Sequence, residues 1–445
     1  MGARGYDQGP LSRLTTAFVT AWIFRTSAWL FIGWLIGWRT LGLLATAALA
    51  THGVALVLHA LRASEAPRRA LLALSLVVLV GGVGTALYPA LAGSGPVPAP
   101  GLMLLACLAV SYLVDVYRGR AVPSPDLAAL LYLLQVPVMP AGPLSRMSEF
   151  SHQVARADIT MAGFSYGVRR IVQGLTKVYL VAGPLGSAAA TIFALRVTTV
   201  STDTAWLGAV CAPLASYFYL TGFTDIGIGL GKMLGFRYQE NFRRPFTADS
   251  LREFWRCWNV TLITWLRDYL GLPIAGHVRP TFARFGLMVA GFVVVGLWFE
   301  VSWKVLPWAV YMATWLALEA LVLGRVMERA PTWVRHLYVL LVTLIGWTLL
   351  RASGPGPLLG YLEAMTGAAV VPFGASRAYL TLGLSTALVS GLVFAGPMVG
   401  NLSRWRVTVD AATASLLMML AATGVLLWQA VRPVAQVLLP RQPRR

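Results

Sequence analysis

The sequence predicts an all-α integral membrane protein that crosses the bilayer many times. Hydrophobic residues make up 57% of the 445 residues and charged residues only 12%. A soluble protein of this length needs more charge to cover its surface. Apolar runs without charge recur along the chain, for example at 101–114 and 285–299. Backbone polar groups in lipid must be satisfied within the segment itself, and a helix does this.

The apolar runs predict about eleven spans, since about 20 apolar residues cross a hydrocarbon layer of about 30 Å. No internal repeat is evident, and no polar stretch is long enough to fold separately, so we expect a single domain over residues 1–445. The predicted spans are residues 17–37, 40–62, 69–92, 100–117, 170–197, 204–231, 284–303, 305–324, 335–351, 376–398 and 410–431.

One further apolar segment, residues 127–143, is short and ends in proline and glycine. It is expected either to cross the membrane or to form a re-entrant segment that is buried against other helices.

Basic residues outnumber acidic residues by 36 to 17, which gives a net charge of +19. They lie in short loops that flank spans, which predicts a cell-membrane protein attracted to anionic lipid rather than a partner of nucleic acid. The basic loop 232–256 and the C-terminal PRQPRR are expected on the cytoplasmic side. The three cysteines are scattered, so neither a disulfide framework nor a metal site is predicted.

The stretch REFWRCWNVTLITWLRDYL, residues 252–270, is unusually polar and aromatic for this chain. Ser250 and Glu253 have the spacing of a capping box, so a helix is expected to begin near Leu251. Three- and four-residue spacing of aromatic and apolar residues predicts one helix with an aromatic face. On pattern alone it could equally be an interfacial amphipathic helix without chemistry. The face consists of Trp255, Trp258, Leu262, Trp265, Leu266 and Tyr269.

Residues 217–270, which contain this stretch, resemble the central signature of membrane-bound O-acyltransferases. The resemblance is greatest to the bacterial branch of alginate O-acetylation and teichoic-acid D-alanyl transfer proteins. Flanking blocks resemble that family in the same order, over about residues 105–355. They are SYLVDVYRG, VPVMPAGPLSR and YGVRRIVQGLTKVYLVAGPL before the signature, and VVGLWFEVSWKVLPWAVY and LVTLIGWTLLRAS after it.

The resemblance implies helices around a tunnel, in which an acyl donor meets a hydroxyl acceptor from the other side of the membrane. The family carries two tunnel histidines, and the second is treated as the base that deprotonates the acceptor. In this sequence Asn259 stands at the first position and Phe299 at the second. Asparagine can donate a hydrogen bond to a carbonyl but takes no proton at neutral pH, and phenylalanine does neither. A mechanism without the usual histidines follows.

Glu300 is the substitute that the local sequence offers for the missing base. A carboxylate in an apolar tunnel has a raised pKa and can act as a base. Glu300 is also one residue beyond the histidine position, which turns its side chain by about 100° on a helix. The alternative is an ion pair with Lys304, one turn further on.

The resemblance also suggests substrate-binding residues within and beside the signature. Asn241 is equally well explained as a loop cap. Arg244 could bind the phosphates of a nucleotide-like donor or an anionic lipid head group. The candidates are Trp255, Trp258, Trp265, Arg267, Asp268, Trp298, Asn241 and Arg244.

Two acidic residues lie inside apolar runs, where a charge usually has a purpose. Asp225 is expected to pair with Arg169, Arg170 or Lys177, or else to line the cavity. Glu319 is expected to find a partner within the bundle.

Two functions remain open from the sequence. The first is an acyltransferase that passes a short acyl group, such as acetyl, from acyl-CoA or another acyl thioester to a glycan or lipid-linked sugar. The second is a catalytically inactive member that binds an acyl donor or lipid, or serves as an accessory subunit. An extracytoplasmic acyltransferase is the partner protein that the resemblance suggests, alongside membrane lipid.

Overall fold

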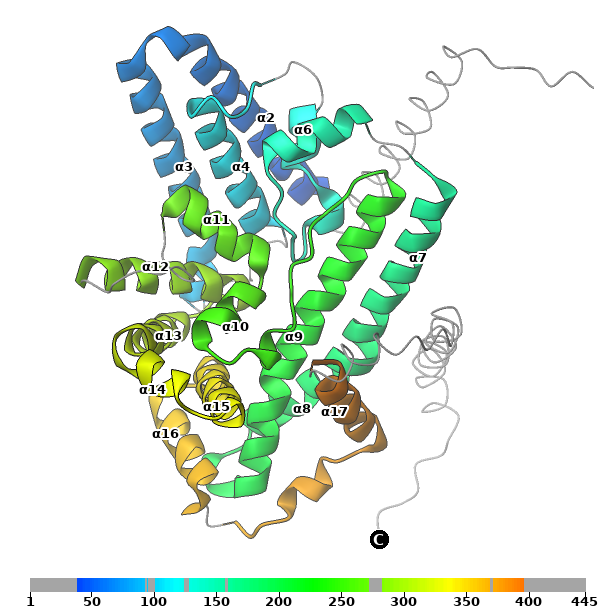
Figure 1. Cartoon of the computed structure of the whole chain (residues 1–445), viewed down its shortest axis with the longest axis vertical. Coiled ribbons are helices and arrows are strands. Elements are labelled where there is room, and N and C mark those ends of the chain that lie inside the picture. Colours follow the sequence, from blue (N-terminus) through cyan, green and yellow to red (C-terminus); the bar gives the residue numbers. More distant parts are fainter. Residues whose placement is uncertain are drawn as a thin grey trace, which may run out of the picture.

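The computed structural model describes residues 38–92, 94, 101–123, 128–156, 159–271, 282–368 and 371–395. Every regular element within those ranges is a helix, and the helices form one bundle (Figure 1). The predicted all-α class is confirmed.

The N-terminal half of this part of the chain contains eight α-helices. They are α2 (Trp38–Ala60), α3 (Glu65–Leu91), α4 (Leu102–Tyr117), α5 (Ala128–Leu133), α6 (Met147–Arg156), α7 (Met161–Thr176), α8 (Gly183–Phe193) and α9 (Thr202–Met233). Helices α7 and α8 are joined by the π-helical turn η3 (Lys177–Ala182).

The C-terminal half contains another eight. They are α10 (Leu251–Cys257), α11 (Val260–Leu270), α12 (Phe282–Phe299), α13 (Val305–Leu318), α14 (Gly324–Glu328), α15 (Thr332–Arg351), α16 (Pro355–Glu363) and α17 (Leu382–Ala395). A second π-helical turn, η6 (Glu319–Leu323), joins α13 to α14.

Within the described ranges, seven helices are long and apolar enough to cross a membrane, judged by length and composition. They correspond to seven of the predicted spans. The spans predicted at 100–117 and 376–398 correspond to the shorter apolar helices α4 and α17. Those predicted at 17–37 and 410–431 lie outside the described residues, so the total of about eleven stays a prediction.

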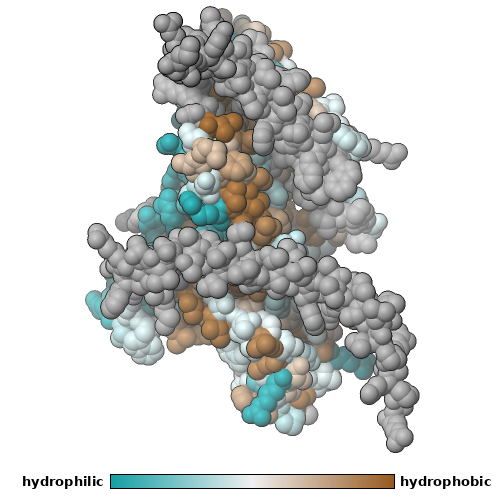
Figure 2. Space-filling view, turned by 90° about the vertical axis from the view of Figure 1, so that its right-hand side faces the viewer, coloured by the Kyte–Doolittle hydropathy of each residue, from teal (hydrophilic) through white to brown (hydrophobic). Residues whose placement is uncertain are grey.

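The outer face of the bundle is strongly apolar, as expected of helices that contact lipid. Figure 2 shows broad hydrophobic patches between smaller polar ones on one side of the molecule. Helix α3 is the clearest case, because only 6% of its most apolar stretch is buried inside the protein.

Helices α7 and α9 pack backbone to backbone through two pairs of glycines. A Cβ atom added to Gly174 would lie 2.5 Å from the carbonyl oxygen of Gly222. A Cβ atom on Gly167 would lie 2.5 Å from that of Gly229. Small residues permit such close approach between membrane helices, so the glycines allow the backbones of α7 and α9 to come into contact.

Asp225 lies on α9 between these two glycine contacts and is 4% exposed. Its carboxylate accepts from Arg170 Nη2 at 2.7 Å and from Lys177 Nζ at 2.5 Å. Arg170 also reaches Glu240, at 2.6 Å. The predicted pairing of Asp225 with α7 is confirmed, through Arg170 and Lys177.

The short apolar segment at 127–143 does not form a membrane-length helix. After α5 it continues as the 3-10 turn η2 (Val136–Val138) and then as irregular backbone with a cis Gly142–Pro143 bond. Residues 141–143 are buried. Irregular backbone inside a membrane protein is tolerated where protein covers it, which supports the re-entrant alternative.

The expectation of one continuous helix from Leu251 to Leu270 is wrong. The helix stops at Cys257 and starts again at Val260, so the stretch consists of α10 and α11. Asn259 between them has φ 45° and ψ 55°, in the left-handed region. The three- and four-residue spacing of apolar residues continues unchanged across the break, so the sequence pattern does not reveal that the helix is interrupted.

Candidate functional site

The break between α10 and α11 is held by backbone hydrogen bonds to the preceding loop. The amide of Arg243 donates to the carbonyl of Cys257 at 2.9 Å, and the amide of Val260 donates to that of Asn241 at 2.8 Å. Asparagine and histidine are among the few non-glycine residues that are enriched in the left-handed region. The backbone therefore explains why a residue of this kind stands at Asn259.

Asn241 joins two of the family-like blocks, the signature and VPVMPAGPLSR. Its Oδ1 accepts from the amide of Thr261 at 3.1 Å and from the Thr261 hydroxyl at 2.8 Å. Its Nδ2 donates to the carbonyl of Ala141 at 3.4 Å, while Thr261 Oγ1 accepts from the amide of Leu144 at 2.9 Å. Asn241 is 1% exposed. The structure therefore shows Asn241 in the loop-capping role.

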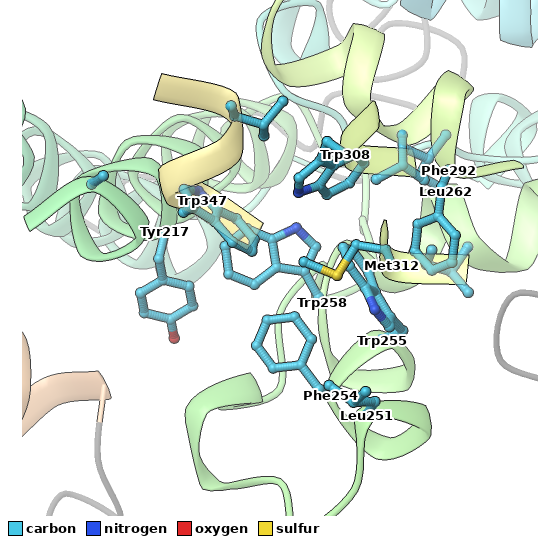
Figure 3. Close-up of a cluster of buried hydrophobic side chains, with 14 of the residues drawn as sticks. Tyr217, Leu251, Phe254, Trp255, Trp258, Leu262, Phe292, Trp308, Met312 and Trp347 are labelled. Carbon is cyan, nitrogen blue, oxygen red and sulfur yellow. The ribbon is translucent and has the colours of Figure 1, made fainter. Parts of the chain in front are cut away.

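Aromatic rings from α12, α13 and α15 lie beside Trp258, which is part of the break; Figure 3 shows Trp258 with Trp308 and Trp347. The ring of Phe299 lies 6.0 Å from Trp258, 6.3 Å from Trp308 and 6.3 Å from Trp347, measured between ring centroids. Trp258 and Trp347 are 5.0 Å apart. We call these four residues the aromatic cluster. It brings Asn259 and Phe299, the two positions at which the resemblance implies histidines, next to the same indole, Trp258.

Trp308 and Trp347 were not singled out by the sequence, although both lie in blocks that resemble the family. No motif histidine or charge marks them there, and a tryptophan in an apolar run is usually explained by packing. Their role at this site becomes visible only when α13 and α15 are placed beside α10.

The other predicted aromatic contacts are structural or peripheral. The indole of Trp265 donates to the carbonyl of Cys107 at 3.0 Å and ties α11 to α4. Trp255 is fully buried against Phe292, with centroids 4.9 Å apart. Trp298 is partly buried and packs between the two largest apolar cores. Of these three, Trp255 lies nearest the aromatic cluster, 6.0 Å from Trp308.

Arg267 and Asp268 lie at the far end of α11 from Asn259. Asp268 pairs with Arg146 and, at 2.8 Å, with Arg267. Nearby, the Tyr269 hydroxyl donates to Asp115 at 2.8 Å. The charges therefore form a separate group and do not reach the aromatic cluster. Arg244 is exposed, in a loop with φ 53°, where a soluble ligand or a lipid head group can reach it.

Glu300 forms the ion pair with Lys304 that was one of the two roles predicted for it from the sequence. Lys304 Nζ lies 2.7 Å from Glu300 Oε1, and the Ser302 hydroxyl donates to the same oxygen at 3.1 Å. Glu300 follows the last residue of α12, so its partners belong to the turn that leads into α13. These contacts do not test the alternative in which Glu300 is the base.

Cys257 lies two residues before Asn259 but is a poor nucleophile. Burial, together with the hydrogen bond that its Sγ donates to Glu253 at 3.4 Å, raises the pKa of this thiol to about 11. It stays protonated at neutral pH, and the thiolate is the reactive form. No group of three or more His, Cys, Asp or Glu residues among the described residues is arranged to hold a metal ion.

Glu319 anchors the start of α10 from the π-helical turn η6. Its carboxylate accepts from the amide of Leu251 at 2.7 Å and from that of Arg252 at 3.1 Å. Glu319 is 6% exposed. The expected partner within the bundle is therefore a helix N-terminus, where a negative charge is favourable.

Replacing Glu319 with alanine is expected to destabilise the protein by about 3 kcal/mol, because two amides at a buried helix end lose a charged acceptor. Ser250→Ala is the matched control at the same helix end. The Ser250 hydroxyl accepts only from the amide of Glu253, at 3.2 Å, so its loss should cost about 1 kcal/mol. Unfolding of both variants in mixed detergent micelles measures the difference. Equal effects would show that Glu319 does not anchor α10.

Comparison with known proteins finds matches over the same region. The model of the MBOAT, membrane-bound O-acyltransferase family matches residues 103–348. Probable alginate O-acetylase AlgI of Azotobacter vinelandii is 35% identical over 248 residues, which are 55% of this chain and 49% of that protein. The chain thus spans about half the length of the alginate O-acetylases that it matches.

More distant relatives act on other acceptors. A peptidoglycan O-acetyltransferase of Helicobacter pylori is 23% identical, over 39% of this chain and 33% of that protein. A teichoic acid D-alanyltransferase of Bacillus subtilis is 26% identical, over 38% of this chain and 44% of that protein. The family match runs from α4 almost to the end of α15. It includes Asn241 and its hydrogen-bond partners, the break between α10 and α11, and the aromatic cluster. The chain therefore belongs to the membrane-bound O-acyltransferase family.

Proposed function

We propose that this protein transfers a short acyl group, such as acetyl, to a hydroxyl of a cell-surface glycan or lipid-linked sugar. Family membership and relatives that acetylate alginate and peptidoglycan support this proposal. The observation that carries it is the buried contact of Trp258 with Phe299, at 6.0 Å beside Asn259. It places Asn259 and Phe299 in one site, in which Trp258 and Asn259 are buried and Phe299 is partly buried.

The acyl donor in this proposal is acyl-CoA or another acyl thioester. The basic loop 232–256 would lie on the cytoplasmic side, with exposed Arg244 available to donor phosphates or lipid heads. The acceptor would arrive from the opposite side, handed to or received from an extracytoplasmic acyltransferase partner. Asn259 would polarise the acyl carbonyl through its amide N–H.

A non-catalytic role is the second candidate, since neither Asn259 nor Phe299 can accept a proton at neutral pH. Such a protein would hold an acyl donor or lipid, or act as an accessory subunit.

Ester-linked acyl groups on surface glycans and lipids test the proposal. Mass spectrometry would compare the wild-type strain, a deletion strain and a deletion strain restored with this chain. We expect an acyl ester to vanish on deletion and to return on restoration. Purified chain with native membranes and [14C]acetyl-CoA then separates the candidates, because an enzyme transfers many acetyl groups per molecule and a binder none. An unchanged ester content on deletion would refute surface acylation.

Glu300→Gln is expected to keep acyl transfer within about threefold of wild type, far from the 10²–10⁴-fold that a lost base costs. The reason is the Lys304 ion pair, which occupies the carboxylate. Lys304→Met is the matched control. If Glu300 does nothing but pair with Lys304, removing either partner should have the same effect on acyl transfer. If only Glu300→Gln lost transfer, the carboxylate would be the base.

A further inference from the structure

Four buried N–H groups around the aromatic cluster have no hydrogen-bond partner among the described residues. They are the indole nitrogens of Trp255, Trp258 and Trp308 and the amide nitrogen of Asn259. Each group of this kind is only a donor. Leaving one unpaired in the interior costs about 1–3 kcal/mol, and native proteins leave few such groups without a reason.

Two of these indoles point toward one another. In Figure 3 the nitrogens of Trp258 and Trp308 face the same space between the rings. Both rings also flank Phe299 and Trp347, at centroid distances of 5.0–6.4 Å. Trp258 immediately precedes Asn259, so a third unpaired donor comes from the next residue in the chain.

Because the unpaired groups are all hydrogen-bond donors, the ligand atom that fits between them is an oxygen with free lone pairs. The indoles of Trp258, Trp308 and Trp347 supply N–H donors, and neither they nor the Phe299 ring supply an oxygen or nitrogen acceptor. An ammonium group or a hydroxyl that must lose its proton finds no acceptor on them. A carbonyl oxygen accepts two hydrogen bonds, and binds more strongly as negative charge develops on it.

We propose that the indole N–H groups of Trp258 and Trp308 hold the carbonyl oxygen of the acyl thioester and stabilise the oxyanion formed during transfer. This inference rests on the proposed function and names the residues and the ligand atom of that same site. It identifies an oxyanion hole made of two indoles.

The transfer then balances without a protein base. The acceptor hydroxyl oxygen forms a bond to the carbonyl carbon, and the π electron pair moves onto the oxygen held by the two indoles. When that pair returns, the carbon–sulfur bond breaks and the thiolate leaves. The hydroxyl proton passes to the departing sulfur, so that an ester and a thiol are the products.

The test removes one N–H at a time while keeping the ring. Trp258 and, separately, Trp308 are replaced with 3-benzothienylalanine, in which sulfur stands for the N–H group. We expect kcat for transfer from [14C]acetyl-CoA in native membranes to fall about 10²-fold or more, with a smaller change in KM. The ligand-free protein should keep or raise its Tm, because an unpaired buried donor has been removed.

The same exchange at Trp206 is the matched control. This indole donates to the carbonyl of Met365 at 2.9 Å, outside the aromatic cluster, so the exchange should lower Tm and leave kcat unchanged. Unchanged kcat in the Trp258 and Trp308 proteins would overturn the inference. A fall of Tm together with kcat would also overturn it, because the N–H groups would then be engaged in the ligand-free protein. If wild-type membranes transfer no acetyl, the proposed function fails and the inference with it.

Discussion

Asp225→Asn is expected to destabilise the protein by about 3–5 kcal/mol, the usual effect of removing one partner of a buried ion pair. Asparagine has the same shape, so packing between α7 and α9 is unchanged. It cannot neutralise Arg170 and Lys177, whose nitrogens lie 2.7 and 2.5 Å from the Asp225 oxygens. The glycine contacts on either side hold the helices too close for these cations to withdraw freely.

Denaturing-detergent titration in micelles measures this effect, and Glu240→Gln is the matched control. Glu240 pairs with the same Arg170 at 2.6 Å, but its side chain is 52% exposed whereas that of Asp225 is 5% exposed. An exposed pair contributes about 0–1 kcal/mol. Adding Lys177→Met to Asp225→Asn should recover part of the stability. Equal losses for the two acidic residues would contradict a buried, charge-determined contact.

Asn241→Ala is expected to lower stability by about 2–5 kcal/mol and to abolish acyl transfer. Two buried donors of Thr261 lose their shared acceptor, at about 1–3 kcal/mol each. The same side chain holds the backbone just after Asn259 through the amide of Thr261, so the break between α10 and α11 loses part of its support. A displacement of about 1 Å in such a site can cost about 10²-fold in rate.

Asn241→Asp separates the two effects. The variant keeps the oxygen that accepts from Thr261, but it replaces the donor to the Ala141 carbonyl, at 3.4 Å, with an oxygen that repels it. It should retain more stability and transfer than alanine, measured by the same detergent titration and by acetyl incorporation. Thr261→Val should resemble Asn241→Ala in direction, since it removes the hydroxyl that links Asn241 to Leu144. A wild-type rate of acyl transfer in Asn241→Ala would show that the hydrogen bonds of Asn241 do not position the site.

Much of the fold could be predicted because membrane solvation leaves plain marks on a sequence. Apolar length located the seven membrane-length helices and the shorter α4 and α17. A charge inside an apolar run identified Asp225 and its partners Arg170 and Lys177. The ion pair of Glu300 with Lys304 followed from one-turn spacing alone. Each of these signals is local, so a single sequence carries it.

The site was less predictable because it depends on contacts between distant segments. The periodicity of Trp255, Trp258, Leu262 and Trp265 continues through a break that is made by hydrogen bonds from residues 241–243. Glu319 lies 68 residues from the amide that it caps. The unpaired state of the Trp258 and Trp308 indoles is likewise a property of their surroundings, and no spacing rule encodes it.

The left-handed backbone at Asn259 restricts which side chains this position can exchange without remodelling the loop. A β-branched or bulky apolar residue would be strained there, whereas glycine, aspartate and histidine are tolerated. The backbone at this position would therefore also accommodate the imidazole that the family resemblance implies there. The substitution Asn259→His would therefore place a titratable ring at this position. It would leave the flanking backbone hydrogen bonds of Asn241 and Arg243 as they are.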